Sequence, residues 1–344
     1  MKFRKYLLGA LLLFLFCGCS SASSGEIVNI YNWGDYIDKE LLDAFEQETG
    51  IHVIYSNFTT NEDLYTKLKN GGSAYDVIVP SEYMAERMMK ESMLRPISEA
   101  GVPNRKEVDP WLLEKTKDPQ QKYTVPYFWG TLGILYNRDL VKKPPTSWSV
   151  LWDETYRREI VMMDSARDSI GVALKCLGYS MNERRPEALE QAKELLIAQY
   201  PLVYGYLVDQ TKDLMKNNEA SLALMYSGDA WDAMRENPAL DYVVPEEGTN
   251  LWFDFWCIPA DAPNPENAER FIDFMLRPEN AAKNAEYVGY SLPSSAAQAL
   301  LSEEEQSSRV AYPAAEVIEK GEIFEDLGDA ISTYNDLWQD VRNQ

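Results

Sequence analysis

The sequence of 344 residues contains one histidine, His52, and this scarcity limits the chemistry that the chain can perform. A catalytic triad, or a metal site built from several imidazoles, needs more histidines than the chain has. The four cysteines show no Cys-x-x-Cys spacing, and a glycine-rich phosphate loop is also missing. We therefore expect no metal site, no cofactor and no catalytic residue in this chain.

Basic residues are also scarce, with 33 Lys and Arg against 55 Asp and Glu and a formal net charge of −22. So acidic a surface repels nucleic acids and anionic membrane surfaces, which makes both poor partners. A cationic ligand is compatible with this charge, although net charge mostly governs solubility and steering. The composition, 45% hydrophobic and 26% charged, is that of a globular protein, and the length suits about two domains.

Long apolar runs are missing except at the N-terminus. There, basic residues at positions 2, 4 and 5 precede an apolar run over 6–16, which is too short to span a bilayer. Gly18, Cys19 and a serine-rich stretch follow, and this pattern resembles a bacterial lipoprotein signal. We predict a signal peptide over 1–18, lipidation of Cys19 and a tethered linker over 19–25. The alternative is an ordinary signal peptide that is cleaved further along the chain.

The predicted lipid anchor implies a mature domain on the outer face of the cell membrane, attached only through its N-terminal lipid. The two remaining cysteines, Cys176 and Cys257, both lie in apolar sequence contexts. This favours buried free thiols, although an exported protein can also join two such cysteines in a disulfide.

Strands and helices alternate along the mature chain, which is typical of parallel sheets covered by helices. The pattern occurs twice, before and after the proline-containing stretch 142–145, and therefore predicts two α/β lobes. Expected strands lie at 27–32, 51–55, 75–79, 159–163, 220–226, 242–244 and 251–259, and expected helices at 39–49, 62–69, from 82, before 178, at 186–198 and around 231.

Aromatic and acidic side chains gather where these strands end, and in open α/β sheets ligands bind outside the carboxyl ends of the strands. One lobe supplies the first groups and the other lobe the later ones, so we predict a site in a cleft between the lobes. The residues concerned are Trp33, Asp35, Tyr36, Ser81, Tyr83, Asp164, Ser165, Asp168, Tyr226, Asp229, Trp252 and Asp254.

Most of these residues also have a purely structural interpretation. Helix capping would explain Ser81, Asp229 and the pair Ser165 and Asp168, and it is the expected role of Asp38. Tryptophans 33 and 252 can be core aromatics, and tyrosines 36 and 83 can cover helix ends. The shared placement of the group at strand ends is what favours a binding site.

Aromatic faces combined with carboxylates suit a flexible organic cation. An ammonium group gains about 0.5–2 kcal/mol over an aromatic ring and about 1.5–3 kcal/mol from a hydrogen bond to a carboxylate. Each methylene removed from water adds about 0.8 kcal/mol. A linear diamine or triamine carries both kinds of group, whereas a neutral sugar would not need several acids.

At these residues the chain resembles the bacterial spermidine/putrescine-binding (PotD-like) family, the solute receptors of polyamine ABC importers. The resemblance runs over nearly all of the mature chain and includes YNWGDYI (31–37), YDVIVPSEYM (75–84), VPYFWGTLGILYN (125–137), ALMYSGDAW (223–231), LWFDFWCIP (251–259), FIDFMLRPENA (271–281) and YVGYSLP (287–293). It implies a two-lobed periplasmic-binding-protein-like fold of type II, closing about hinge strands near Gly130 and Asp254. The implied lobes are 26–130 with 254–300, and 131–253 with 301–344.

The resemblance also implies which residues touch the ligand. Matching positions are Trp33, Tyr36, Ser81, Tyr83, Trp252, Asp254 and Tyr290, with aromatic rings around the methylenes and Asp254 on an ammonium group. Asp35 falls where the family has an acid or a small polar residue.

Several positions depart from the pattern of the spermidine-binding members. Ser165 and Asp168 stand where those members carry an Asp-x-x-Glu pair, and Tyr226 stands where they carry Trp. Asp229 stands where putrescine-binding members place a carboxylate, and Phe324 replaces a Gln. The preference between spermidine and putrescine therefore stays open.

The function predicted by the resemblance is that of a non-enzymatic receptor, which passes a polyamine to permease subunits driven by a cytoplasmic ATPase. Two alternatives remain at the level of the sequence. The same fold can bind a basic amino acid, a sugar or ferric ion, although the adjacent tyrosines common in ferric receptors are missing. An enzyme acting through two of the carboxylates Asp168, Asp229 and Asp254 would be the other alternative.

Overall fold

A computed structural model describes residues 26–71 and 74–344, and it confirms the prediction of a mixed α/β fold. The strands form one continuous arrangement in the order β2-β1-β3-β9-β4-β7-β5-β6, with β8 beside β4. The predicted signal peptide, the linker and Cys19 lie outside the described residues. Within the described part of the chain, no helix is both long and apolar enough to cross a membrane.

The first part of the chain forms parallel strand pairs with intervening helices, as predicted. Strand β1 pairs in parallel with β2 and with β3, which is shorter than the strand expected at 75–79. Asp38 caps the following helix, as expected, by accepting a hydrogen bond from the Glu40 amide at 2.9 Å. The elements are β1 (Ile27–Trp33), α1 (Lys39–Thr49), β2 (His52–Phe58), α2 (Asn61–Lys69), β3 (Val77–Ile78), α3 (Glu82–Lys90), η1 (Pro103–Glu107) and α4 (Pro110–Leu113).

The middle of the chain forms a second set, in which β5 lies in parallel between β6 and β7. The sequence did not predict β6, because this edge strand is half-exposed and carries a glycine, Gly205, in its centre. The elements are η2 (Trp148–Trp152), η3 (Glu154–Tyr156), β5 (Ile160–Met163), α5 (Ala166–Cys176), α6 (Pro186–Gln199), η4 (Tyr200–Leu202), β6 (Val203–Leu207), α7 (Gln210–Lys216), β7 (Leu222–Tyr226), α8 (Ser227–Glu236) and β8 (Leu240–Val243).

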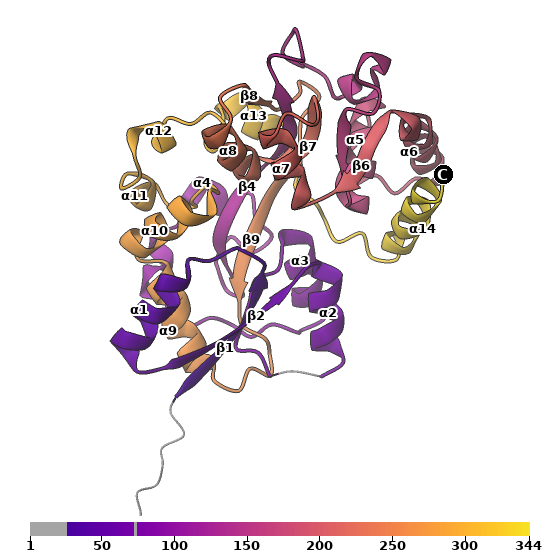
Figure 1. Cartoon of the computed structure of the whole chain (residues 1–344). Helices are drawn as coiled ribbons and strands as arrows, with labels where there is room; N and C mark the ends of the chain where they lie inside the picture. The colour runs from indigo at the N-terminus through magenta and orange to yellow at the C-terminus, as the bar shows by residue number, and fades with distance from the viewer. Residues whose placement is uncertain (1–25, 72–73) are drawn as a thin grey trace, which may run out of the picture.

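Strand β4 (Thr124–Asn137) joins the two sets, and all of its 14 residues are buried. Its first part pairs antiparallel with β9 (Leu251–Cys257), and its second part pairs with β7 and β8. The change of partner falls at Thr131 and Leu132, directly after Gly130. In Figure 1, β4 and β9 run between the part of the molecule that contains β1 and β2 and the part that contains β5 to β8.

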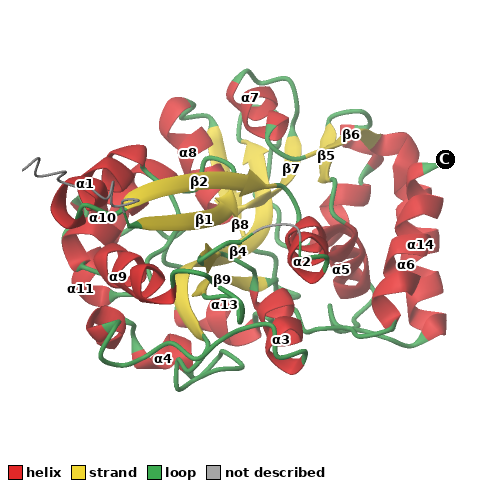
Figure 2. Ribbon diagram, turned by 90° about the horizontal axis from the view of Figure 1, so that it is seen from below, coloured by secondary structure: helices red, strands yellow, loops and turns green. Residues whose placement is uncertain are grey.

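The last part of the chain contributes helices to both ends of the molecule. Helices α9 and α10 lie near α1, whereas α14 lies against α5 and α6, as Figure 2 shows. The elements are α9 (Pro265–Met275), α10 (Pro278–Val288), α11 (Ser295–Gln298), α12 (Glu303–Gln306), α13 (Ala315–Lys320) and α14 (Ala330–Arg342).

Buried apolar side chains form separate clusters on the two sides of the β4 partner change. Ile30, Phe45 and Phe271 belong to a cluster on the β1 side, and Ile160 and Leu174 to one on the β5 side. Both sides therefore have a core of their own.

Both described cysteines are free, as expected. Cys257 is buried in β9, whereas Cys176 at the end of α5 is only half-buried, which corrects the expectation for that residue.

Gly130 lies in β4 in close contact with β9 and with the start of α8. A β-carbon added there would lie 2.6 Å from the Ser227 hydroxyl oxygen and 2.6 Å from the Trp252 ring. We expect Gly130→Ala to lower the free energy of unfolding by about 1–3 kcal/mol, because the buried site has no room for a methyl group. Urea unfolding measures the change. Gly34→Ala is the control, since a β-carbon there meets nothing within 4 Å, and equal midpoints for both variants would contradict the explanation.

Candidate functional site

The carboxylate of Asp254 lies at the centre of the candidate site. It is 6% exposed, and it accepts hydrogen bonds from the Tyr36 hydroxyl and the Ser81 hydroxyl, both at 2.6 Å. Among the described residues, no Lys, Arg or His lies within ion-pair distance of Asp254. The two hydroxyl groups solvate the carboxylate but leave its charge uncompensated.

Burial raises the pKa of Asp254 to about 6, although the hydrogen bonds from Ser81 and Tyr36 act against this rise. At neutral pH the group is therefore ionised, at a cost that a cation beside it would relieve.

Ser81 reaches Asp254 because of its position at the start of α3. It occupies the N-cap, as its capping interpretation expected, but its side chain makes no capping hydrogen bond. The Asn61 side-chain amide holds Ser81 instead, accepting from its backbone N–H at 3.0 Å and donating to its hydroxyl at 3.1 Å. Sequence reasoning missed Asn61, because nothing in the local sequence distinguishes it from an ordinary first-turn residue of α2.

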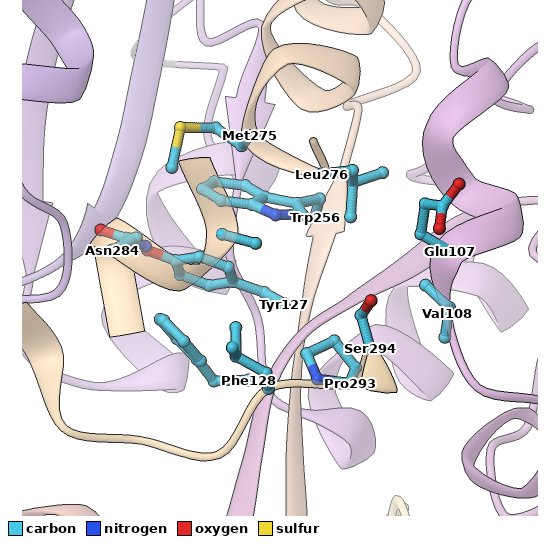
Figure 3. Close-up of a pocket in the computed structure, with 12 residues that line it drawn as sticks. Glu107, Val108, Tyr127, Phe128, Trp256, Met275, Leu276, Asn284, Pro293 and Ser294 are labelled. Carbon is cyan, nitrogen blue, oxygen red and sulfur yellow. The ribbon is translucent and has the colours of Figure 1, made fainter. Parts of the chain in front are cut away.

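Tyr36 is held in place through its backbone by the Tyr127 hydroxyl. Its backbone carbonyl accepts a hydrogen bond from the Tyr127 hydroxyl, which in turn accepts one from the Asn284 amide at 2.8 Å. Asn284 also accepts from the Asp38 backbone N–H at 2.8 Å. The Tyr127 ring also packs edge-on against the Tyr36 ring, with centroids 5.3 Å apart. Figure 3 shows Tyr127, Asn284 and Trp256 among the residues that line a pocket.

Aromatic rings from four segments of the chain lie together near Asp254. The Trp252 ring packs edge-on against Tyr290, with centroids 5.0 Å apart, and against Tyr226 at 5.7 Å. Tyr36 and Tyr290 lie 5.6 Å apart. The structure thus brings together the predicted residues Tyr36, Tyr226, Trp252 and Tyr290.

Asp168 is a second buried carboxylate, on the other side of this aromatic group. It is 3% exposed, and one of its oxygens accepts from the Tyr226 hydroxyl at 2.8 Å and from the Ser165 hydroxyl at 2.6 Å. The Ser165 side chain also caps α5, so the capping interpretation of Ser165 holds alongside its contact with Asp168. Burial raises the pKa of Asp168, while the hydroxyl donors and Arg167 act against this rise.

Asp229 lies in the first turn of α8 and is not its N-cap, a position that Tyr226 occupies. The capping alternative for Asp229 was therefore wrong. One carboxylate oxygen accepts from the Tyr290 hydroxyl at 2.8 Å, and the other lies 3.3 Å from the Lys212 ammonium group. Asp229 is thus connected to the aromatic group, but a lysine of the chain already balances its charge. Asp164, at the end of β5, pairs with Arg342 at 2.8 Å.

The other predicted residues take different positions. Tyr83 accepts from Asn61 at 3.1 Å and donates to Glu62 at 3.2 Å, so Asn61 connects it to Ser81. Trp33 is half-buried, donates to the Val79 carbonyl at 2.9 Å and packs on Phe58, as its core interpretation expected.

Asp35 is exposed in the turn after β1, with a left-handed backbone (φ 45°). Within the described part of the chain, no hydrogen bond or ion pair joins Asp35 to Asp254, to Asp168 or to the aromatic rings near them.

Comparisons with known proteins identify the family of the chain. A family model described as bacterial extracellular solute-binding protein matches residues 40–314. The chain is 38% identical to the spermidine/putrescine-binding periplasmic protein of Salmonella typhimurium over 343 residues, 99% of both chains. It is 31% identical to the putrescine-binding periplasmic protein PotF of Escherichia coli, over 86% of this chain and 85% of the other. A solved structure described as a putative spermidine/putrescine ABC transporter from Listeria monocytogenes matches with a TM-score of 0.89 and 41% identity, covering 92% of this chain and 99% of that one.

The chain therefore belongs to the bacterial extracellular solute-binding proteins. Within them it belongs to the PotD-like group of polyamine-binding proteins of ABC transporters, as the sequence motifs predicted. Membership in this family identifies a solute-binding protein rather than an enzyme, which removes the hydrolase alternative.

The contact between Tyr127 and Tyr36 gives a prediction for stability. In Tyr127→Phe the hydroxyl is lost, and the buried Asn284 amide loses its acceptor. We expect a decrease of about 1–3 kcal/mol in the free energy of unfolding, measured by urea unfolding. The control is Tyr204→Phe, whose ring is 46% exposed. A Tyr127→Phe protein as stable as this control would show that the hydrogen bonds of the Tyr127 hydroxyl do not contribute to the free energy of unfolding.

Proposed function

We propose that this protein is an extracytoplasmic lipoprotein receptor, which binds a polyamine, spermidine or putrescine, and delivers it to the permease of an ABC importer. The observation that carries the proposal is the buried Asp254 carboxylate, ionised at neutral pH, hydrogen-bonded by two hydroxyls and lacking a cationic partner among the described residues. A ligand ammonium group would supply the missing charge. The names of the relatives, which describe spermidine and putrescine binding, support the same ligand class.

The aromatic side chains support binding of the apolar part of such a ligand. Trp252 packs edge-on against Tyr290 and Tyr226, and Tyr226 donates to Asp168, so the methylene groups of a linear amine bound between the two carboxylates would lie against these rings. Each methylene would contribute about 0.8 kcal/mol, and each ammonium group on a carboxylate about 1.5–3 kcal/mol. Two ammonium contacts and four methylenes together contribute about 6–9 kcal/mol, which exceeds the lower part of an association cost of about 4–15 kcal/mol.

We further propose that binding closes two lobes, 26–130 with 254–300 and 131–253 with 301–344, about β4 and β9. The separate clusters of buried residues on the two sides of the β4 partner change support this division. Segment 301–344 fits this division in large part, since Val310 and Val341 pack in cores of the second lobe. Leu301, at its start, packs in the core of the first lobe. The proposed site would lie between the lobes, with Asp254 and Tyr36 on one side and Asp168 and Tyr226 on the other.

The lipid anchor at Cys19 rests on the sequence of the N-terminal segment. It is consistent with the extracellular description of the family. An anchored receptor would stay close to the permease, and the ATPase would act only on the cytoplasmic side.

The direct test of this proposal is the variant Asp254→Asn, which keeps the shape of the side chain and removes its charge. We expect the affinity for putrescine and spermidine to fall about 10- to 150-fold, because a charge-assisted hydrogen bond of about 1.5–3 kcal/mol is lost. Isothermal titration calorimetry measures the change. The control is Asp261→Asn, an exposed acid in a turn after β9, which should bind like the parent. Unchanged affinity in Asp254→Asn would overturn the assignment.

The pKa of Asp254 predicts how binding depends on pH. Because burial raises this pKa to about 6, the carboxylate becomes protonated below pH 6, whereas alkylammonium groups stay charged. Affinity should therefore fall up to tenfold for each pH unit below 6 and level off above it. The Glu82 carboxyl also lies near Asp254, but burial raises its pKa to about 8, so it is mostly neutral from pH 5 to pH 7.

Titration calorimetry at pH 5, 6 and 7 tests this dependence, with Asp254→Asn as the control that should show a weaker slope. An affinity that stays constant from pH 5 to pH 7 would contradict the role of an ionised Asp254.

A further inference from the structure

Glu86, Lys90 and Asp326 form a charged cluster between α3 and the segment that connects α13 to α14. The Glu86 carboxylate accepts from the Asp326 backbone N–H at 3.0 Å and lies 3.0 Å from the Lys90 ammonium group. Lys90 also lies 3.2 Å from the Asp326 carboxylate, so one lysine bridges two acids. Beside the cluster, Lys117 pairs with Glu325 at 3.0 Å. Opposite charges from distant parts of the chain therefore meet here.

The two acids of the charged cluster are shielded from water more than the lysine is. The side chains of Glu86 and Asp326 are 15% and 14% exposed, whereas that of Lys90 is 55% exposed. Two half-buried carboxylates beside the same ammonium group would repel each other without it, because water screens their charges less than at an open surface. The contact between α3 and the connecting segment therefore depends on Lys90.

The connecting segment is held in place by the second proposed lobe. Glu322 pairs with Lys175 of α5 at 2.7 Å. The Asn182 side chain donates to the Ile323 carbonyl at 2.8 Å and accepts from the Glu325 backbone N–H at 2.9 Å. These contacts place the segment relative to the second lobe, and none of them involves α3.

The charged cluster thus joins the two proposed lobes. Helix α3 belongs to the lobe that contains 26–130, whereas the connecting segment belongs to 301–344, and it passes beside α3 in Figures 1 and 2. The cluster also lies away from the candidate site. Helix α3 begins beside that site, and Lys90 lies about 12 Å further along the helix than Glu82.

We propose that the charged cluster of Glu86, Lys90 and Asp326 stabilises the closed arrangement of the lobes and slows release of the ligand without contacting it. The inference rests on the proposed function and on the proposed closure of the two lobes. The charges would separate when the lobes open, so the cluster stabilises the closed state and not the open one. Lys90 is then a residue that sets the affinity for the ligand from outside the binding site.

The test is Lys90→Gln, with putrescine and spermidine as ligands. Stopped-flow measurements of tryptophan fluorescence give the rate constants of association and dissociation, since Trp252 lies in the candidate site. We expect dissociation to become about 3- to 10-fold faster, because a half-buried cluster of three charges contributes more than one exposed ion pair. Association, which takes place on the open state, should change less than twofold. Lys90→Arg keeps the charge and should retain slow dissociation.

Lys283→Gln is the matched control for the loss of one positive charge. Lys283 is 44% exposed and also lies between two acids, 2.7 Å from Glu40 and 3.6 Å from Asp38. All three residues belong to the same proposed lobe, so this variant should keep both rate constants of the parent protein. In 0.5 M NaCl the difference between Lys90→Gln and the parent should become smaller, because salt screens the half-exposed lysine.

The outcomes separate this inference from the proposed function. Binding of both amines or of one by the parent, with equal dissociation rates in the parent and in Lys90→Gln, would overturn the role of the charged cluster and leave the polyamine function standing. An equal acceleration in Lys283→Gln, or a change confined to association, would do the same. Binding of neither amine by the parent protein would overturn both proposals.

Discussion

The site depends on one constraint, a carboxylate buried without a cation of its own. Asp254 has two hydroxyl groups as hydrogen-bond donors and no ion-pair partner among the described residues. Hydroxyl donors keep a buried carboxylate ionised, but they do not neutralise it. The protein thus bears an electrostatic cost that a bound cation would relieve, and this difference between empty and occupied states provides the driving force for the proposed binding.

The rest of the fold brings distant segments to this carboxylate. Strand β9 carries Asp254 and Trp252, and its neighbours β3 and β4 deliver Ser81 and fix the region around Gly130. Tyr36 reaches the same point from the turn after β1, held by Tyr127. Strand β4 changes partners from β9 to β7, so the strand that supports Asp254 continues into the sheet that carries Tyr226 and leads to Asp168. A motion about this strand would alter the distance between the two carboxylates, which is how ligand binding and lobe closure would be coupled.

Much of this arrangement follows from the sequence, because strand ends and residue types are local properties. The alternation of strands and helices predicted the α/β fold. The positions of aromatic and acidic residues after the strands predicted most of the side chains that lie near Asp254 and Asp168. Other features depend on contacts between distant segments and have no local signal. Asn61 holds Ser81 across 20 residues, and Arg167 reaches Glu325 across 158 residues. Asp35 differs from these residues, since it lies exposed in a left-handed turn, and its place in the site stays a prediction.

The crystal structure of the protein grown with putrescine would test the central claim most directly. The account predicts that one ammonium nitrogen lies about 2.7–2.9 Å from an oxygen of Asp254, with the methylene groups against Trp252 and Tyr290. A ligand bound elsewhere, or one whose ammonium groups leave Asp254 without a cationic contact, would contradict it.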